Sequence, residues 1–402
     1  MLIAIKVNWS LRGSRKWPFV LLVALSSQTS VKAMQLRMIC DLPTAVDDSF
    51  RISEANALSA DGKTVVGTLR SGTFRGAFRW TSDEGFVDVG DLRVNSILGY
   101  NYSQLHGVSD DGRIVVGSSS IDALRYNEAI KWTEGQGLVG LGDLPGGIHS
   151  SFAMAVSGNG HTIVGSAADE NSDVAVRWTE SGGLERLPGG ELHVAIGVSA
   201  DGTVVIGSSF ANPLGIVWDD NRGSTPIGDL PGGEVSNYPL DISADGTTVV
   251  GYSGSDIGGE AYRWTRETGI VGLGLLPGGI SGSRATGVNA DGSVIVGTAG
   301  SGDSHEEGYI WNERDGMISI RRLLIDHNVD VAGWILSRPV GISDDGLVIL
   351  GNGYFEGRSI AWLIDLSEVP EPRSDLMIVA GMLILPAALQ RRKKETRSPG
   401  PL

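Results

Sequence analysis

The chain reads Ala57-Leu58-Ser59-Ala60-Asp61-Gly62-Lys63-Thr64-Val65-Val66-Gly67, and a tryptophan, Trp80, follows on the next apolar stretch. This phrase occurs seven times, with its turns 42 to 54 residues apart. The turns and tryptophans are Asp61-Gly62 with Trp80, Asp111-Gly112 with Trp132, Asn159-Gly160 with Trp178, Asp201-Gly202 with Trp218, Asp245-Gly246 with Trp264, Asp291-Gly292 with Trp311, and Asp345-Gly346 with Trp362. A period in the forties is the length of a four-stranded propeller blade.

Each period predicts four strands. Two β-branched stretches flank Asp-Gly, whose glycine supplies the positive φ of a tight hairpin, so strands one and two pair. Strand three carries the Trp, and strand four is expected to end in Leu-Pro-Gly-Gly, a sharp turn toward the next blade. Because no stretch of the core sustains apolar residues at helical spacing, the prediction is an all-β chain folded as a seven-bladed β-propeller.

The seventh repeat lacks a fourth strand. Its third strand, 359–364, runs directly into Val369-Pro370-Glu371-Pro372. The missing strand is found at the other end of the chain, where Met38 to Pro43 resembles the segment from Leu141 to Pro145. We therefore predict that this N-terminal strand completes the last blade and closes the ring, which removes two free sheet edges.

The first 33 residues have the features of a secretory signal peptide. Basic residues precede a short apolar stretch, and small residues lead to a cleavage site after Ala33. The alternative, a membrane anchor, needs about 20 apolar residues, more than this stretch provides. A lipoprotein signal is disfavoured because Ile39 precedes Cys40, the single cysteine, where a small residue is expected. The propeller domain is expected to span 34–368.

The C-terminal segment, 369–402, combines three unlike features in order. Val369-Pro370-Glu371-Pro372 is followed by an apolar run, 376–389, and by a basic cluster that begins with Arg391-Arg392. This arrangement resembles the PEP-CTERM sorting signal of exported proteins in Gram-negative bacteria. The resemblance implies processing by an exosortase, transient membrane association through this segment, and a cell-surface or extracellular location. A retained C-terminal anchor stays open as the alternative.

The repeats resemble the HAF family of bacterial extracellular repeats. Gly197 to Gly207, Arg263-Trp264 and Leu273 to Gly279 match its recurrent segments, and the similarity spans roughly 55–365. The resemblance implies a repeat architecture and carries no enzymatic role.

The predicted propeller is strongly acidic. Residues 40–368 contain 20 Lys and Arg against 44 Asp and Glu, a net charge of about −24. Such a surface repels nucleic acid, whose recognition requires Lys and Arg at the phosphates. Extracellular polysaccharide or surface proteins are the expected partners, and a cationic or metal-bridged ligand suits the acidic loops.

No catalytic, cofactor or metal-binding residue is predicted. Each Asp-Gly turn offers one carboxylate, whereas Ca²⁺ needs six to eight oxygens, so a hairpin role is favoured. The repeat tryptophans are expected to pack in the core rather than to form stacking platforms. The six histidines accompany no zinc motif and no serine-hydrolase motif.

Propeller geometry assigns the loops to two faces. The Asp-Gly turns and the turns between strands three and four share one face, which we call the turn face. The loops between strands two and three and the blade-to-blade connections form the other, the loop face. Its loops vary most, so a ligand site is expected there. The candidate residues are His149, His193, Asp303, Glu306 and Glu307.

Two functions remain open from the sequence. The favoured one is an exported binding or structural propeller module. The alternative is a periplasmic or surface polysaccharide-active enzyme that uses carboxylates at the propeller mouth. Two carboxyl groups at glycosidase spacing in that mouth would favour the enzyme.

Overall fold

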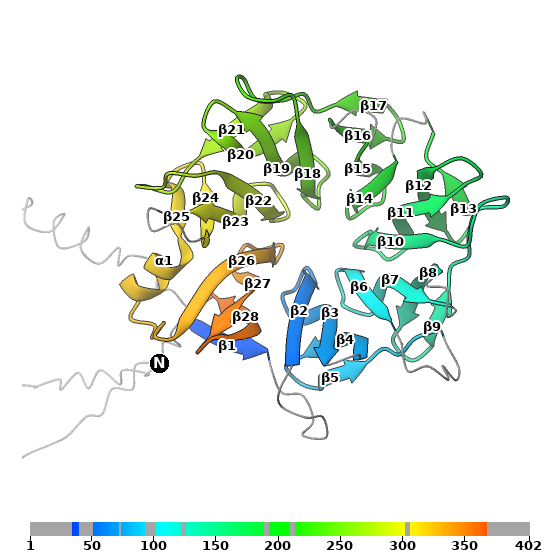
Figure 1. The fold of residues 1–402 in the computed structure, drawn as a ribbon, viewed down its shortest axis with the longest axis horizontal. Coiled ribbons are helices and arrows are strands. Elements are labelled where there is room, and N and C mark those ends of the chain that lie inside the picture. The colour runs from blue at the N-terminus through cyan, green and yellow to red at the C-terminus, as the bar shows by residue number, and fades with distance from the viewer. Residues whose placement is uncertain are drawn as a thin grey trace, which may run out of the picture. The chain divides into compact units, whose positions relative to one another are not determined.

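The computed structural model describes residues 34–39, 51–71, 74–92, 102–121, 126–188, 193–209, 214–301 and 306–367. These residues form seven four-stranded antiparallel sheets arranged around a central axis (Figure 1). The predicted seven-bladed β-propeller is confirmed. The predicted signal peptide, 1–33, and sorting segment, 369–402, lie outside the described residues.

Within blades 1 to 6, the four strands follow one another in sequence and in space, and blade 7 has three such strands. The first strands, nearest the axis in Figure 1, are β2 (Arg51–Leu58), β6 (Ser103–Val108), β10 (Ser151–Val156), β14 (Val194–Val198), β18 (Asn237–Ile242), β22 (Ser283–Val288) and β26 (Trp334–Ile342). The second strands are β3 (Thr64–Ser71), β7 (Ile114–Ser120), β11 (Thr162–Ala168), β15 (Val204–Ser208), β19 (Thr248–Ser255), β23 (Val294–Gly300) and β27 (Val348–Phe355).

The outer half of each blade is made of the two remaining strands. The third strands are β4 (Phe74–Thr81), β8 (Asn127–Thr133), β12 (Asp173–Thr179), β16 (Gly215–Asp219), β20 (Gly258–Thr265), β24 (Glu306–Asn312) and β28 (Arg358–Asp365). The fourth strands are β5 (Gly85–Asp88), β9 (Gly137–Gly140), β13 (Gly183–Arg186), β17 (Gly223–Pro226), β21 (Gly269–Gly274), β25 (Gly316–Ser319) and, in blade 7, β1 (Gln35–Ile39).

Three residues of the repeated phrase build the turn between strands one and two. In blade 1, Ser59 Oγ donates to Asp61 Oδ1 at 2.7 Å and accepts from the Thr64 amide at 2.9 Å. Asp61 Oδ1 also accepts from the Lys63 amide at 3.0 Å, and Gly62 has φ +71°. The carboxylate is thus engaged inside the hairpin, as a turn role requires. Two blades use asparagine in this network, Asn159 for the Asp and Asn289 for the Ser.

The glycine that ends each Val-Val-Gly run faces a β-bulge in the first strand. In blade 2 the pairing skips His106, between Leu105 and Gly107. A Cβ on Gly117 would lie 1.8 Å from the Gln104 carbonyl oxygen, so only glycine fits there. The same bulge recurs in the first strand of each blade.

The repeat tryptophans pack within the blades, as predicted, but one of them lies at a different position. Trp80 pairs with Val65, the second residue of β3. In blade 7 the equivalent partner, Ile349, pairs with Ile364. Trp362 instead pairs with Gly351 and is fully buried, so it is offset by two residues from the tryptophans of the other blades.

The N-terminal strand closes the ring, as predicted, with shifted bounds. β1 runs antiparallel to β28, and Met38 lies opposite Trp362. The strand begins three residues before the predicted start, at Gln35, and its last residue, Ile39, is buried in the core between blades 7 and 1. Positions 40–43 of the predicted strand lie outside the described residues.

Two details correct the expected blade. The fourth strands end before Leu-Pro-Gly-Gly, since β9 stops at Gly140 and Leu144 follows in the connection. The chain is also not purely β, because α1 (Ile320–Asp326) connects blade 6 to blade 7. Ser319 caps this helix, and Ile320 and Leu324 bury its inner face. Among the described residues, no helix is long and apolar enough to cross a membrane.

Candidate functional site

The two predicted histidines stand in different environments on the loop face. His149 precedes β10 and is exposed, with Nδ1 3.2 Å from Asp143 Oδ2. His193 precedes β14 and is half-buried. It occupies the position that Ser103 and Ser151 hold in blades 2 and 3, where the serine hydroxyl accepts an amide hydrogen bond from the preceding blade. This position therefore contributes to blade packing.

The predicted acidic loop is described only in part. Asp303 lies outside the described residues. The Glu307 carboxylate accepts a hydrogen bond from Ser319 Oγ, which also caps α1, so this side chain is engaged in the fold. Glu306 is exposed and lines a pocket. Of the predicted site residues that the structure describes, Glu306 alone lines that pocket.

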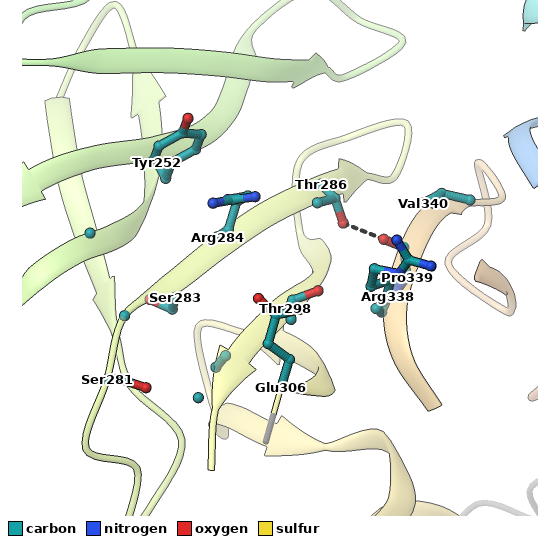
Figure 2. Close-up of a pocket in the computed structure, with 14 residues that line it drawn as sticks. Tyr252, Ser281, Ser283, Arg284, Thr286, Thr298, Glu306, Arg338, Pro339 and Val340 are labelled. Carbon is teal, nitrogen blue, oxygen red and sulfur yellow. Dashed lines mark hydrogen bonds between the residues drawn. The ribbon is translucent and has the colours of Figure 1, made fainter. Parts of the chain in front are cut away.

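The pocket lies on the loop face and has a volume of about 410 Å³, within the range of small-molecule sites. It is shared by blades 5, 6 and 7, where Tyr252 comes from β19, Arg284 from β22 and Arg338 from β26 (Figure 2). Thr298 and Glu306 add further polar groups. The lining thus carries two guanidinium groups and one carboxylate.

Hydrogen bonds between blades 6 and 7 fix the strands that carry the arginines. Thr286, the bulged residue of β22, donates from Oγ1 to the Pro339 carbonyl at 2.8 Å (Figure 2). Thr298 donates from Oγ1 to the Ser337 carbonyl at 3.0 Å. Both contacts join a residue near Arg284 to a residue beside Arg338, so the pocket has a preorganised floor.

Neither arginine is neutralised by a carboxylate in the described part of the chain. The Arg284 guanidinium carbon lies 4.5 Å from the centre of the Tyr252 ring, a cation–π contact. Arg338 is exposed and makes no ion pair with any described residue. Arginine keeps its charge and offers a planar donor pair that matches a carboxylate or phosphate. The pocket is therefore suited to an anionic group, within a strongly acidic propeller.

The arginines were missed because charge was summed over the whole propeller. The signal lies in one register position of the first strands, two residues before the bulge. That position is held by Glu54, Gln104, Phe152, Val194, Tyr238, Arg284 and Arg338. It varies from repeat to repeat, whereas the residue that follows it is always Ala, Leu or Pro. Aligning the repeats on the bulge would have shown two adjacent blades with arginine there.

The comparisons with known proteins show the fold. No family model matches the chain, and no curated protein matches it. An oligogalacturonate lyase from Vibrio parahaemolyticus is 15% identical, with a TM-score of 0.53 over 85% of this chain and 98% of that one. An oligogalacturonate lyase in complex with manganese is 12% identical, with a TM-score of 0.54 over 85% and 97%. TolB from Acinetobacter baumannii is 13% identical, with a TM-score of 0.43 over 76% and 81%.

The two oligogalacturonate lyases share the β-propeller architecture with this chain, and a shared architecture leaves the chemistry to the site. Across the described segments, no group of three or more His, Cys, Asp or Glu side chains is arranged to hold a metal ion.

Proposed function

We propose that this protein is an exported propeller module that binds acidic saccharides in the loop-face pocket. The observation that carries the proposal is the pair Arg284 and Arg338, which face one concave site without a carboxylate partner among the described residues. A sugar carboxylate would accept paired hydrogen bonds from a guanidinium group, and charge-assisted bonds of this kind are the strong ones.

The acidic net charge of the propeller is compatible with this ligand class. At physiological ionic strength, exposed charges are largely screened beyond about 8 Å. The guanidinium groups act at contact distance, so they dominate over carboxylates elsewhere on the surface. Hydroxyl groups of Thr286 and Thr298 lie on the same floor. The pocket therefore combines one site for negative charge with a polar surface for sugar hydroxyls.

Galacturonic acid is the appropriate first probe. Two propellers of similar fold are named as oligogalacturonate lyases, so this architecture can present a site to a uronate chain. Galactose is the matched neutral control, because it has the same ring without the carboxylate. The purified protein should bind galacturonic acid in calorimetric titration and should bind galactose at least tenfold more weakly.

The arginines are tested by neutral substitution. Arg284→Gln and Arg338→Gln should each weaken galacturonate binding about tenfold or more, since a hydrogen bond to a charged group contributes roughly 1.5–3 kcal/mol. Arg314→Gln is the control, because Arg314 is an exposed arginine on the turn face of the same blade 6. Equal affinity for galactose, or an unchanged affinity in both pocket variants, would disprove the proposal.

A polysaccharide-active enzyme remains the second candidate, and Glu306 is the observation that favours it. This exposed carboxylate shares the pocket with the two arginines. An enzyme would shorten trigalacturonate during incubation with the protein, and Glu306→Gln would abolish that activity. A binding module would leave the trisaccharide intact.

Export is proposed from the two terminal segments. The signal-like N-terminus and the PEP-CTERM-like C-terminus support delivery to the cell surface or extracellular material, with an exosortase as processing partner. Intact-mass measurement on protein from the native host should find both 1–33 and the cluster that begins at Arg391 removed. A surface form that retains 391–402 would point to a permanent anchor.

A further inference from the structure

The loop face carries a stacked aromatic pair that extends beyond the pocket toward the axis. Tyr252 lines the pocket, and its ring stacks on Tyr238 with centroids 4.9 Å apart and planes inclined by 18°. Tyr238 and Tyr252 are directly opposed on β18 and β19. The first strand of blade 5, β18, lies nearer the axis than β19 (Figure 1), so Tyr238 belongs to the more axial strand of this pair.

Tyr238 leaves a large aromatic surface in solvent. It is 39% exposed, although tyrosine usually buries most of its ring when it belongs to a packed core. Its stacking partner also contacts Arg284, whose guanidinium carbon is 4.5 Å from the Tyr252 ring centre. The aromatic pair and the charged pocket are therefore one continuous surface, linked through Tyr252.

Tyr238 also belongs to the same register position as the two arginines. In blades 5, 6 and 7 this position is held by Tyr238, Arg284 and Arg338 in turn. Equivalent positions in the first strands of adjacent blades lie at the same depth along the axis. A ligand that contacts the arginines can thus continue across Tyr238 without moving deeper into the propeller.

We infer that Tyr238 forms a second sugar subsite beside the arginine pocket, so that the protein recognises a uronate chain rather than a single residue. The inference rests on the proposed function and adds chain length to it. The exposed ring offers an apolar face to the C–H face of a pyranose, while the neighbouring unit keeps its carboxylate on the arginines. Tyr238 acts here as a specificity residue and does not itself bind the charge.

The test compares galacturonic acid with trigalacturonate by calorimetric titration. In the wild type, the trisaccharide should bind about tenfold more tightly than the monosaccharide. Tyr238→Val should abolish that gain and leave monosaccharide affinity within about twofold of the wild-type value. Tyr238→Trp should retain the gain, because stacking needs an aromatic ring. Valine keeps the strand preference of the site, so the fold should be retained.

Tyr354→Val is the matched control. Tyr354 is 40% exposed on β27 of blade 7, outside the pocket lining, so its loss should leave the gain intact. The inference is overturned if Tyr238→Val preserves the chain-length gain, or if it weakens the monosaccharide equally. If the wild type binds neither saccharide, the proposed function fails as well. If it binds galacturonic acid but shows no gain with the trisaccharide, only the Tyr238 subsite fails.

Discussion

Asp241 departs from the repeat at a position of the first strand. It stands immediately after the bulged residue of its first strand, where the other blades carry Ala57, Gly107, Ala155, Gly197, Gly287 and Gly341. Its side chain is half-buried, and its carboxyl group accepts hydrogen bonds from the amides of Ile242 and Val288, the second of which lies in the next blade. Burial, with the negative charge of Asp344 nearby, raises the pKa of Asp241 to about 7.

This raised pKa predicts a pH-dependent stability. Between about pH 4 and pH 7 the folded protein keeps a proton on Asp241 that the unfolded chain has already released. The stabilisation is therefore full below pH 4 and is lost as the pH rises to 7, by up to about 4 kcal/mol in the free energy of unfolding. Asp241→Ala, the residue of blades 1 and 3, should flatten this decline in melting temperatures measured from pH 4 to pH 8.

Asp201→Asn provides the control for Asp241. The pKa of Asp201 is lowered by hydrogen bonds from the Ser199 hydroxyl and from Thr203. The contribution of Asp201 to stability is therefore lost as the pH falls, which is opposite to that of Asp241. Asparagine fits the turn, since Asn159 occupies the equivalent position in blade 3. This variant should retain the decline between pH 4 and pH 7. An Asp241→Ala profile parallel to the wild type would contradict the assignment.

Residue chemistry explains which features were predictable. The Ser–Asp–Gly turn could be predicted from the sequence, because the Ser and Asp side chains have partners within the turn and glycine readily adopts the positive φ. The bulge at His106 and the glycine at 117 depend on a carbonyl of another strand, which local propensity does not indicate. The arginine pocket joins three blades, so its residues meet only once the ring is formed.

At the scale of elements, ring closure depends on β1 and on the junction of blade 7 with blade 1. Asn352 of β27 accepts from the Ala55 amide at 2.9 Å and donates to the Ala55 carbonyl at 2.8 Å. On the turn face, the Asp344 amide donates to the Ala60 carbonyl at 2.9 Å. β1 adds the fourth strand of the sheet and buries Ile39 against blade 1.

Deleting residues 34 to 44 should expose the edge of β28 and remove the burial of Ile39. Burying an isoleucine side chain contributes about 1.5–3 kcal/mol, so the melting temperature should fall by several degrees. Scanning calorimetry on the truncated and intact chains measures this. Arg37→Ala, an exposed change within β1, should melt like the wild type. An unchanged melting temperature after truncation would show that β1 does not stabilise the ring.

Element boundaries were harder to predict than element order. The order of strands follows from the alternation of β-branched runs and turns, and the paired closure follows from a missing strand. Two features could not be predicted in this way: the start of β1 at Gln35 and the two-residue offset of Trp362. Both depend on which side chains fit between blades 7 and 1. The helix α1 follows blade 6, where the sequence lacks the Leu-Pro-Gly-Gly turn that follows blades 2 to 5.

At the scale of the whole molecule, the local charge of the pocket differs in sign from the net charge of the propeller. In the blade 1 hairpin the Asp61 carboxylate is hydrogen-bonded within the turn, whereas the loop-face pocket presents Arg284 and Arg338 beside one carboxylate, Glu306. The summed charge predicted a cationic or metal-bridged ligand, and the local charge of the pocket favours an anionic one. With a cationic ligand, Glu306 should strengthen binding, whereas with an anionic ligand it should weaken binding.

The most direct measurement is calorimetric titration of galacturonic acid into wild-type and Glu306→Gln protein. Removing this negative charge should tighten binding about threefold, because the carboxylate opposes the ligand at close range. Glu307→Gln, the same change one residue away on a side chain engaged by Ser319, should have a smaller effect. Weaker galacturonate binding by Glu306→Gln, or a wild type that binds spermine and ignores galacturonate, would contradict the assignment of the pocket to acidic saccharides.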